Sequence, residues 1–340
     1  MPPKACIVDH SFHKQTHSFD FVRQFLSQEY ELHDYWDDAW NGGGHVPIEQ
    51  LNEYETIFFF QSINPTRELA KVRSKMVWIP MYDDVTQQRA FWLNLSTIPI
   101  KTVCFSKRLH EVITSFGVPS IFAQYYQDPA RFSRTTDFVS KRVFFWLRGS
   151  IGLHVVAKLL GENNIDSMDL QLVPDPKFEH SVPDPELVEK YHIRMTRGFL
   201  SRSEYLTLVS RNNIYIAPRM KEGIGLNSLE ALTMGQCVLA HNDSTMNEYI
   251  INGRNGILFD AKRPQQVDLS AFESLANQAY ERCVKGWSQW QNDIGRILDF
   301  TRAPFSIARS KTLSFMFRTW CILLFDGIRK RVRNLFWSKP

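Results

Sequence analysis

The sequence predicts an α/β protein made of two parallel, doubly wound sheets in series. Short continuous apolar runs alternate with segments of helical periodicity along most of the chain, which is typical of parallel strands covered on both faces. A polar stretch at 127–141 interrupts this alternation. The 340 residues leave room for two domains of about 150 residues each, and 44% hydrophobic against 22% charged residues is ordinary for a globular protein.

The first half of the chain contains the apolar runs of the first sheet. They lie at 5–8, 30–36, 56–60, 76–81, 99–105 and 120–126. Between the first two runs, Phe19, Val22, Phe25 and Leu26 follow helical spacing. Because helical crossovers join parallel strands, we expect these runs to form one parallel sheet.

The alternation resumes after the polar stretch, which we interpret as a linker between domains. Apolar runs lie at 143–147, 169–173, 193–196, 214–217, 237–240 and 257–259. Helical patterns lie at 153–160, 202–210 and 227–234, and the chain from 268 onwards reads as helices. We therefore expect a second parallel sheet followed by a helical C-terminus.

Charge is distributed unevenly along the chain. The formal net charge is +4, but the two ends of the chain differ in sign. Residues 301–340 contain nine Lys/Arg and one acidic residue, whereas 1–60 contain ten acidic residues and three Lys/Arg. A nucleic-acid-binding protein of uniformly basic character is therefore excluded. The five cysteines include no C-x-x-C pair, which indicates reduced thiols in a cytoplasmic protein rather than disulfides or structural zinc.

The two ends of the chain bear on its location. The start lacks the long apolar run of a secretory signal, and the longest apolar stretch, 313–325, contains Arg318 and is too short to span a bilayer. In 326–340, Arg and Lys alternate with Trp and Phe, a pattern suited to lying on an anionic membrane surface. The alternative is a solvated tail.

The segment 217–240 carries the clearest chemical pattern. A strand ends near Pro218, Gly223 and Gly225 lie in a tight loop, and a helix starts near 226. Glycines allow a ligand to approach the backbone closely, and the N-terminus of the new helix attracts anions. Glu222 and Glu230 lie just before and one turn inside this helix, where their carboxylates can hold sugar hydroxyls beside a bound phosphate.

The full pattern is Pro-x-x-x-Glu-Gly-x-Gly-Leu, a second glutamate at 230, and then Ala-Leu-x-x-Gly-x-x-Val-Leu-Ala. It resembles the C-terminal signature of glycosyltransferase family 4, which comprises retaining enzymes of GT-B fold. The segments 198–201, 247–250 and 252–258 resemble the family's neighbouring motifs, so the similarity covers roughly 195–260.

The resemblance implies an overall arrangement. Two Rossmann-like domains face a central cleft, an acceptor domain at 1–135 and a nucleotide-sugar donor domain at 136–300. A C-terminal helix at about 304–325 crosses back to complete the first domain, and 326–340 forms the basic aromatic tail.

The resemblance also implies roles for single residues. Glu230 holds the ribose hydroxyls, Glu222 contacts the donor sugar, and Phe199 and Leu200 flank the base. Backbone amides hold the distal phosphate and the sugar, namely those of Gly223, Ile224, Gly225 and Leu226.

The diphosphate is expected to be neutralised by cationic side chains. Arg148 matches the family's arginine, but Ile151 stands where the family has a lysine, so Lys221 or Arg219 is expected to replace it. The chain has no Asp-x-Asp pair, so no metal site and a metal-independent reaction are expected.

Two loops of the first domain are candidates for acceptor recognition and catalysis. His10, His13 and His17 follow the first strand, where the family usually has two glycines. They are interpreted as acceptor-side residues, with ordinary surface histidines or zinc binding as alternatives. Asp83, after the fourth strand, is the candidate for orienting or deprotonating the acceptor hydroxyl, with a helix N-cap as the alternative.

The predicted function is transfer of a hexose-type sugar, with retention, from a nucleotide diphosphate to a hydroxyl acceptor. A UDP-sugar is the expected donor, no cofactor is expected, and the acceptor is a glycan or lipid-linked precursor in lipid-linked or envelope glycan assembly. The expected location is the cytoplasmic face of a membrane, contacted through 326–340. The alternatives are a sugar-nucleotide epimerase of GT-B fold and a non-catalytic glycan- or partner-binding protein.

Overall fold

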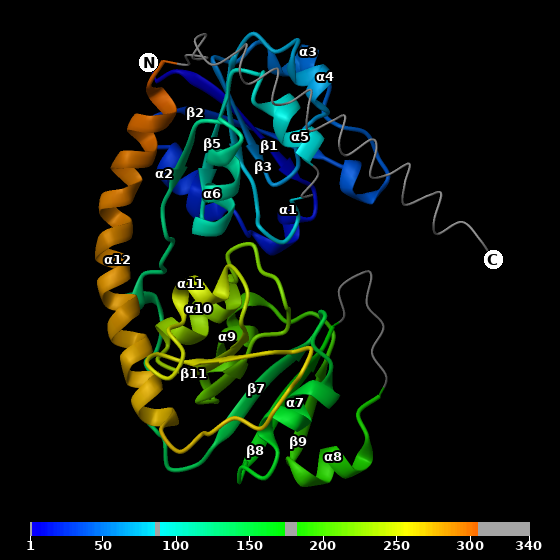
Figure 1. Ribbon diagram of the computed structural model, residues 1–340, viewed down its shortest axis with the longest axis vertical. Coiled ribbons are helices and arrows are strands. Elements are labelled where there is room, and N and C mark those ends of the chain that lie inside the picture. The colour runs from blue at the N-terminus through cyan, green and yellow to red at the C-terminus, as the bar shows by residue number, and fades with distance from the viewer. Residues whose placement is uncertain (1, 86–88, 174–181, 305–340) are drawn as a thin grey trace, which may run out of the picture.

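The computed structural model describes residues 2–85, 89–173 and 182–304, which form two α/β domains joined by a long helix (Figure 1). Each domain contains a six-stranded sheet, with strand order β2-β1-β3-β4-β5-β6 in the first and β12-β11-β10-β7-β8-β9 in the second. All strand pairs within them are parallel. The prediction of two parallel, doubly wound sheets is confirmed.

The elements of the first domain follow the apolar runs of the sequence. The strands are β1 (Lys4–His10), β2 (Glu31–Asp37), β3 (Thr56–Phe60), β4 (Lys75–Ile79), β5 (Ile100–Cys104) and β6 (Ser120–Phe122). The helices are α1 (His13–Thr16), α2 (Asp20–Leu26), α3 (Ile48–Leu51), α4 (Thr66–Leu69), α5 (Arg89–Leu95) and α6 (Lys107–Ser115), with 3-10 turns η1 (Ala39–Asn41) and η2 (Pro129–Arg131).

The second domain repeats this arrangement. Its strands are β7 (Arg142–Leu147), β8 (Ser167–Leu172), β9 (Ile193–Arg197), β10 (Ile214–Ile216), β11 (Cys237–His241) and β12 (Ile257–Phe259). Its helices are α7 (Leu153–Leu160), α8 (Pro185–Lys190), α9 (Arg202–Ser210), α10 (Leu226–Thr233), α11 (Met246–Tyr249) and α12 (Phe272–Arg302).

Strand β6 is shorter than the apolar run that predicted it. The run at 120–126 continues beyond Phe122, but its last residues leave the sheet and contact the second domain. The Gln124 side chain donates to the Glu248 carbonyl at 2.9 Å, and the Tyr126 ring packs edge-on against Tyr249. The end of this run therefore packs partly against the second domain, through Gln124 and Tyr126, and partly against the first, where Tyr125 stacks on Phe21.

Helix α12 crosses from the second domain to the first (Figure 1). Its far end contacts the first domain: the Trp290 ring lies edge-on to Phe25, and Arg302 pairs with Glu29 at 2.8 Å. The Lys101 ammonium donates to the Phe300 carbonyl at 2.5 Å, at the C-terminal end of the helix. Helix α12, which is continuous over 31 residues, therefore contacts both domains.

The predicted helix at 304–325, apart from Pro304, and the predicted tail at 326–340 lie outside the described residues. Within the part of the chain that the structure describes, no helix combines the length and apolar character needed to cross a bilayer.

Candidate functional site

The glycine-containing turn leads directly from strand β10 into helix α10. Gly225 is the N-cap and has φ +75°, a left-handed conformation that suits glycine, and a Cβ there would lie 2.6 Å from the Met246 sulfur. As a glycine, Gly225 provides no side-chain cap for the first turn of α10. Its backbone N–H groups, together with the helix dipole, therefore form an anion-attracting end beside the turn.

This turn contacts the first domain directly. A Cβ on Gly223 would lie 2.8 Å from Asp83 Oδ1 and 3.0 Å from the Met81 Cβ, so only glycine fits against the loop that follows β4. Thr245 Oγ1 donates to the Glu222 carbonyl at 2.9 Å and to that of Gly223 at 2.8 Å, which fixes the turn from behind. The domains thus meet at the predicted donor loop.

Arg219 lies between Glu222, which is predicted to contact the donor sugar, and Asp83, which is predicted to act on the acceptor hydroxyl. Its Nη1 is 3.6 Å from Asp83 Oδ2 and 4.0 Å from Glu222 Oε2. Burial raises the pKa of Asp83, and Arg219 opposes that rise. The structure therefore brings together Asp83 and Glu222, which are 139 residues apart in the sequence, around one guanidinium.

Glu230 is buried one turn inside α10. Its Oε1 accepts from Arg202 Nη2 at 2.6 Å and from Gln127 Nε2 at 3.5 Å. Its Oε2 is enclosed and has no hydrogen-bond partner among the described residues. Burial raises the pKa of Glu230, and Arg202 opposes that rise most strongly.

The predicted base-flanking residues lie just before α9. Phe199 is 74% exposed and follows Gly198, which has φ +85°. Ser201 caps α9 and forms a capping box with Glu204. This cap fixes where the helix begins, and so places Phe199 within a few residues of the arginine that pairs with Glu230.

The turns after β7 and β10 are hydrogen-bonded to each other. Ser150 Oγ accepts from the Met220 amide at 2.8 Å, and a Cβ on Gly149 would lie 2.5 Å from the Arg219 Cγ. Ile151, at the position of the expected lysine, is fully buried in the core of the second domain. Arg219 thus passes directly beside the 148–151 turn.

The remaining two predicted cations lie against aromatic rings. The Arg148 guanidinium carbon is 4.2 Å from the centroid of the Trp146 ring, and Lys221 Nζ is 5.9 Å from that of the Tyr82 ring. Tyr82 belongs to the same loop as Asp83, so Lys221 also lies at the contact between the domains.

The three predicted acceptor-side histidines have different surroundings. His10 stacks on Trp40 with ring centroids 4.4 Å apart, and burial lowers the pKa of His10. The His13 Nδ1 lies 2.7 Å from Asp9, within the first domain. His17 is exposed and pairs with Asp20. No group of side chains able to hold a metal ion occurs in the described ranges.

A contact that the sequence analysis did not assign joins the domains at Glu248. Its carboxylate accepts from Ser106 Oγ at 2.9 Å and from the amides of Lys107 at 2.6 Å and Arg108 at 3.1 Å, at the N-terminus of α6. Glu248 belongs to a segment that resembles a family motif, but no local signal indicated its partner.

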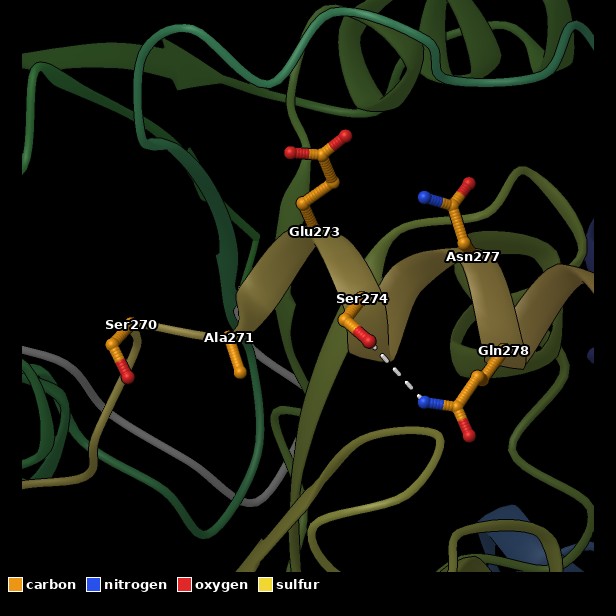
Figure 2. A pocket seen from close by; sticks show the side chains of 6 residues that line it. All are labelled: Ser270, Ala271, Glu273, Ser274, Asn277 and Gln278. Atoms are coloured by element: carbon orange, nitrogen blue, oxygen red, sulfur yellow. Dashed lines mark hydrogen bonds between the residues drawn. The ribbon is translucent and has the colours of Figure 1, made fainter.

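A separate hollow lies at the start of α12 (Figure 2). Its lining consists of Ser270, Ala271, Glu273, Ser274, Asn277 and Gln278. It contains none of the predicted site residues, and we assign it no ligand.

Comparison with known proteins shows that part of the second domain is similar to glycosyltransferases. Residues 186–285 match the family described as glycosyl transferases group 1. A sucrose synthase from Melioribacter roseus is 28% identical over 138 residues, and one from Solanum tuberosum is 26% identical over 153 residues. These alignments cover 34% and 43% of this chain and 17% of each relative, so the similarity concerns a small part of those larger proteins.

Solved structures resemble nearly the whole described fold. A sucrose-phosphate synthase from Thermosynechococcus elongatus superposes with TM-score 0.62, covering 88% of this chain and 98% of that one at 12% identity. Anabaena HepE, in complex with UDP and glucose, superposes with TM-score 0.57, covering 87% and 100% at 12% identity. The prediction of a GT-B fold is thereby confirmed, while the activity and the site residues stay predictions.

Proposed function

We propose that this chain is a retaining glycosyltransferase of the family 4 type, which transfers a sugar from a nucleotide diphosphate to a hydroxyl acceptor. The observation that carries the proposal is Glu230, a buried carboxylate with an unpartnered oxygen one turn inside a helix whose N-cap is a glycine. A buried acceptor without a partner is costly, and a ribose hydroxyl is a donor of the required kind. Solved structures of this fold were obtained with UDP, which supports a UDP-sugar donor.

The diphosphate would lie at the N-terminus of α10. The amides of Gly223 to Leu226 would donate to its oxygens, and Arg148, Arg219 and Lys221 would balance its charge. The contact of Gly223 with Asp83, which holds the 223–225 turn against the first domain, supports this position for the donor. Such close approach of the two domains would exclude water and so limit hydrolysis of the donor.

The transfer step would form one bond and break one at the same face of the sugar. The acceptor oxygen bonds to the anomeric carbon, the bond from that carbon to the diphosphate oxygen breaks, and the acceptor proton passes to the diphosphate. Glu222 would hold the donor sugar. Asp83, which lies beside the donor loop, would orient the acceptor hydroxyl.

The acceptor would enter from the first domain, past His10 and His13. We propose a glycan or lipid-linked precursor as acceptor, and contact with the cytoplasmic face of a membrane through 326–340. Deleting 326–340 should reduce binding to vesicles containing phosphatidylglycerol and leave the weak binding to phosphatidylcholine vesicles unchanged. Equal binding of the deleted and full-length chains to anionic vesicles would contradict the proposed membrane contact.

The donor is tested by calorimetric titration and thermal shift with UDP-, GDP- and dTDP-glucose. One of them should bind the wild type, and Glu230→Gln should weaken that binding about tenfold or more, because a hydrogen bond to a charged group contributes about 1.5–3 kcal/mol. Glu189→Gln, at an exposed glutamate of the same domain, is the matched control. No binding by the wild type would refute the proposal, and binding without sugar transfer or donor hydrolysis would indicate a non-catalytic protein.

A further inference from the structure

Arg202 and Glu230 form an ion pair that covers the buried end of the candidate donor site. Arg202 is the first residue of α9, and its side chain is 57% exposed, whereas that of Glu230 is only 4% exposed. Their closest atoms, Nη2 and Oε1, are 2.6 Å apart. The guanidinium therefore lies at the rim of the site with the carboxylate beneath it.

The pair uses only one oxygen of the carboxylate. A carboxylate accepts hydrogen bonds at both oxygens, and Arg202 and Gln127 both bind Oε1. Oε2 is left enclosed without a partner among the described residues. The arrangement holds the carboxylate in one orientation and leaves one acceptor for a further donor.

Arg202 is also the principal source of positive charge at Glu230. Burial favours the neutral acid, and the groups that favour the carboxylate are Arg202, then Gln127, then the more distant Arg131. The other titratable groups that act on this region are tyrosines with raised pKa, which are neutral phenols at neutral pH: Tyr125, Tyr205 and Tyr215.

We infer that Arg202 is a positioning residue for nucleotide binding, which holds the Glu230 carboxyl group turned so that Oε2 accepts a ribose hydroxyl of a nucleoside diphosphate. This inference rests on the proposed function. In its role Arg202 acts through Glu230 and makes no essential contact to the nucleotide itself.

A double-mutant cycle separates action through Glu230 from direct binding. The dissociation constant of UDP, GDP, ADP and dTDP is measured for the wild type, Arg202→Met, Glu230→Gln and the double variant, and the tightest ligand is carried forward. Arg202→Met should weaken binding about tenfold at pH 7, because Glu230 then loses both the hydrogen bond that orients it and the positive charge that favours its carboxylate form. In the Glu230→Gln background the same change should have little further effect.

The pH dependence of nucleotide binding distinguishes a loss of charge at Glu230 from a loss of packing, because a loss of packing alone would not change it. A protonated Glu230 cannot accept at Oε2 as a carboxylate does, so binding by Arg202→Met should weaken further as the pH falls from 8 to 6. The ratio to the wild type at each pH cancels the titration of the nucleotide phosphate. Arg202→Lys should restore part of the affinity, and Arg254→Met, at an exposed arginine of the same domain, should leave it unchanged.

The outcomes distinguish this inference from the function on which it rests. If the wild type binds no nucleoside diphosphate, the proposed function fails and the inference fails with it. If the wild type binds but the losses from Arg202→Met and Glu230→Gln add, Arg202 contacts the nucleotide directly and only the inference is wrong. Tighter binding by Arg202→Met would likewise overturn it, since Arg202 would then obstruct Glu230.

Discussion

Replacing Glu248 by alanine removes a carboxylate that accepts three hydrogen bonds across the contact between the domains. The donors lie at the start of α6, where Ser106 is the N-cap and itself accepts from the Leu109 amide at 3.3 Å. Ser106 thus accepts a hydrogen bond from one amide of the first turn, and Glu248 accepts hydrogen bonds from the two amides before it, those of Lys107 and Arg108. One side chain of the second domain thereby completes a helix end of the first.

The size of the effect follows from these bonds. Hydrogen bonds to a charged group contribute about 1.5–3 kcal/mol each when shielded, but these amides are reached by water, so we take about 1 kcal/mol for each. A carboxylate at a helix N-terminus adds about 0.3–1 kcal/mol. The Glu248→Ala variant should therefore lose about 3–4 kcal/mol of contact between the domains, which raises the population of separated domains by about 150- to 700-fold.

Hydrogen exchange and thermal unfolding measure this loss. The first-turn amides of α6 should exchange faster in Glu248→Ala, and the unfolding midpoint should fall by a few degrees. Glu248→Gln keeps one acceptor oxygen, so its amide exchange rates and unfolding midpoint should lie between those of the wild type and those of Glu248→Ala. Glu189→Ala, at an exposed glutamate of α8, is the control. If exchange at Lys107 and Arg108 in Glu248→Ala equals that of the wild type, the reasoning is refuted.

Further predictions concern two glycines of α12 and the contact of Gly223 with Asp83. Gly286→Ala should destabilise the protein by about 1–3 kcal/mol in urea unfolding, because its Cβ would lie 2.5 Å from the Tyr126 ring. Gly295→Ala, where the added Cβ would meet open space, should stabilise the protein by about 0.5–1 kcal/mol. Stabilisation by Gly286→Ala together with destabilisation by Gly295→Ala would contradict these expectations. Gly223→Ala should weaken donor binding while secondary structure by circular dichroism stays unchanged, since a Cβ would lie 2.8 Å from Asp83; unaltered binding would show that this contact is not needed. Burial raises the pKa of Asp83 in the folded protein above its ordinary value of 3.8. The free energy of unfolding of the wild type, relative to that of Asp83→Asn, should therefore increase as the pH falls through the raised pKa towards 3.8. A difference between the two proteins that does not depend on pH would argue against burial as the cause.

The local parts of the site could be predicted from the sequence. The β10–α10 turn carries its own signals, because Gly225 needs a left-handed backbone and helical spacing begins at once after it. The position of Glu230 one turn inside the helix follows from the same local geometry. Ser201 and Glu204 likewise mark the start of α9 within four residues of chain.

The partners of these residues could not be predicted, since they come from distant parts of the chain. Nothing near Arg202 in the sequence indicates that it meets Glu230, and nothing near Asp83 indicates that it touches Gly223.

The sequence by itself determined the two parallel sheets, the glycine turn and the two glutamates beside it, because each of these depends on spacing over a few residues. Only the tertiary structure decided which charges meet. Three contacts depend on strand order and on how the two domains pack: the ion pair of Arg202 with Glu230, the hydrogen bonds of Glu248 to the start of α6, and the contact of Asp83 with Gly223. Those pairings join segments 28 to 142 residues apart, and periodicity within a segment carries no information about which distant side chain will lie opposite it.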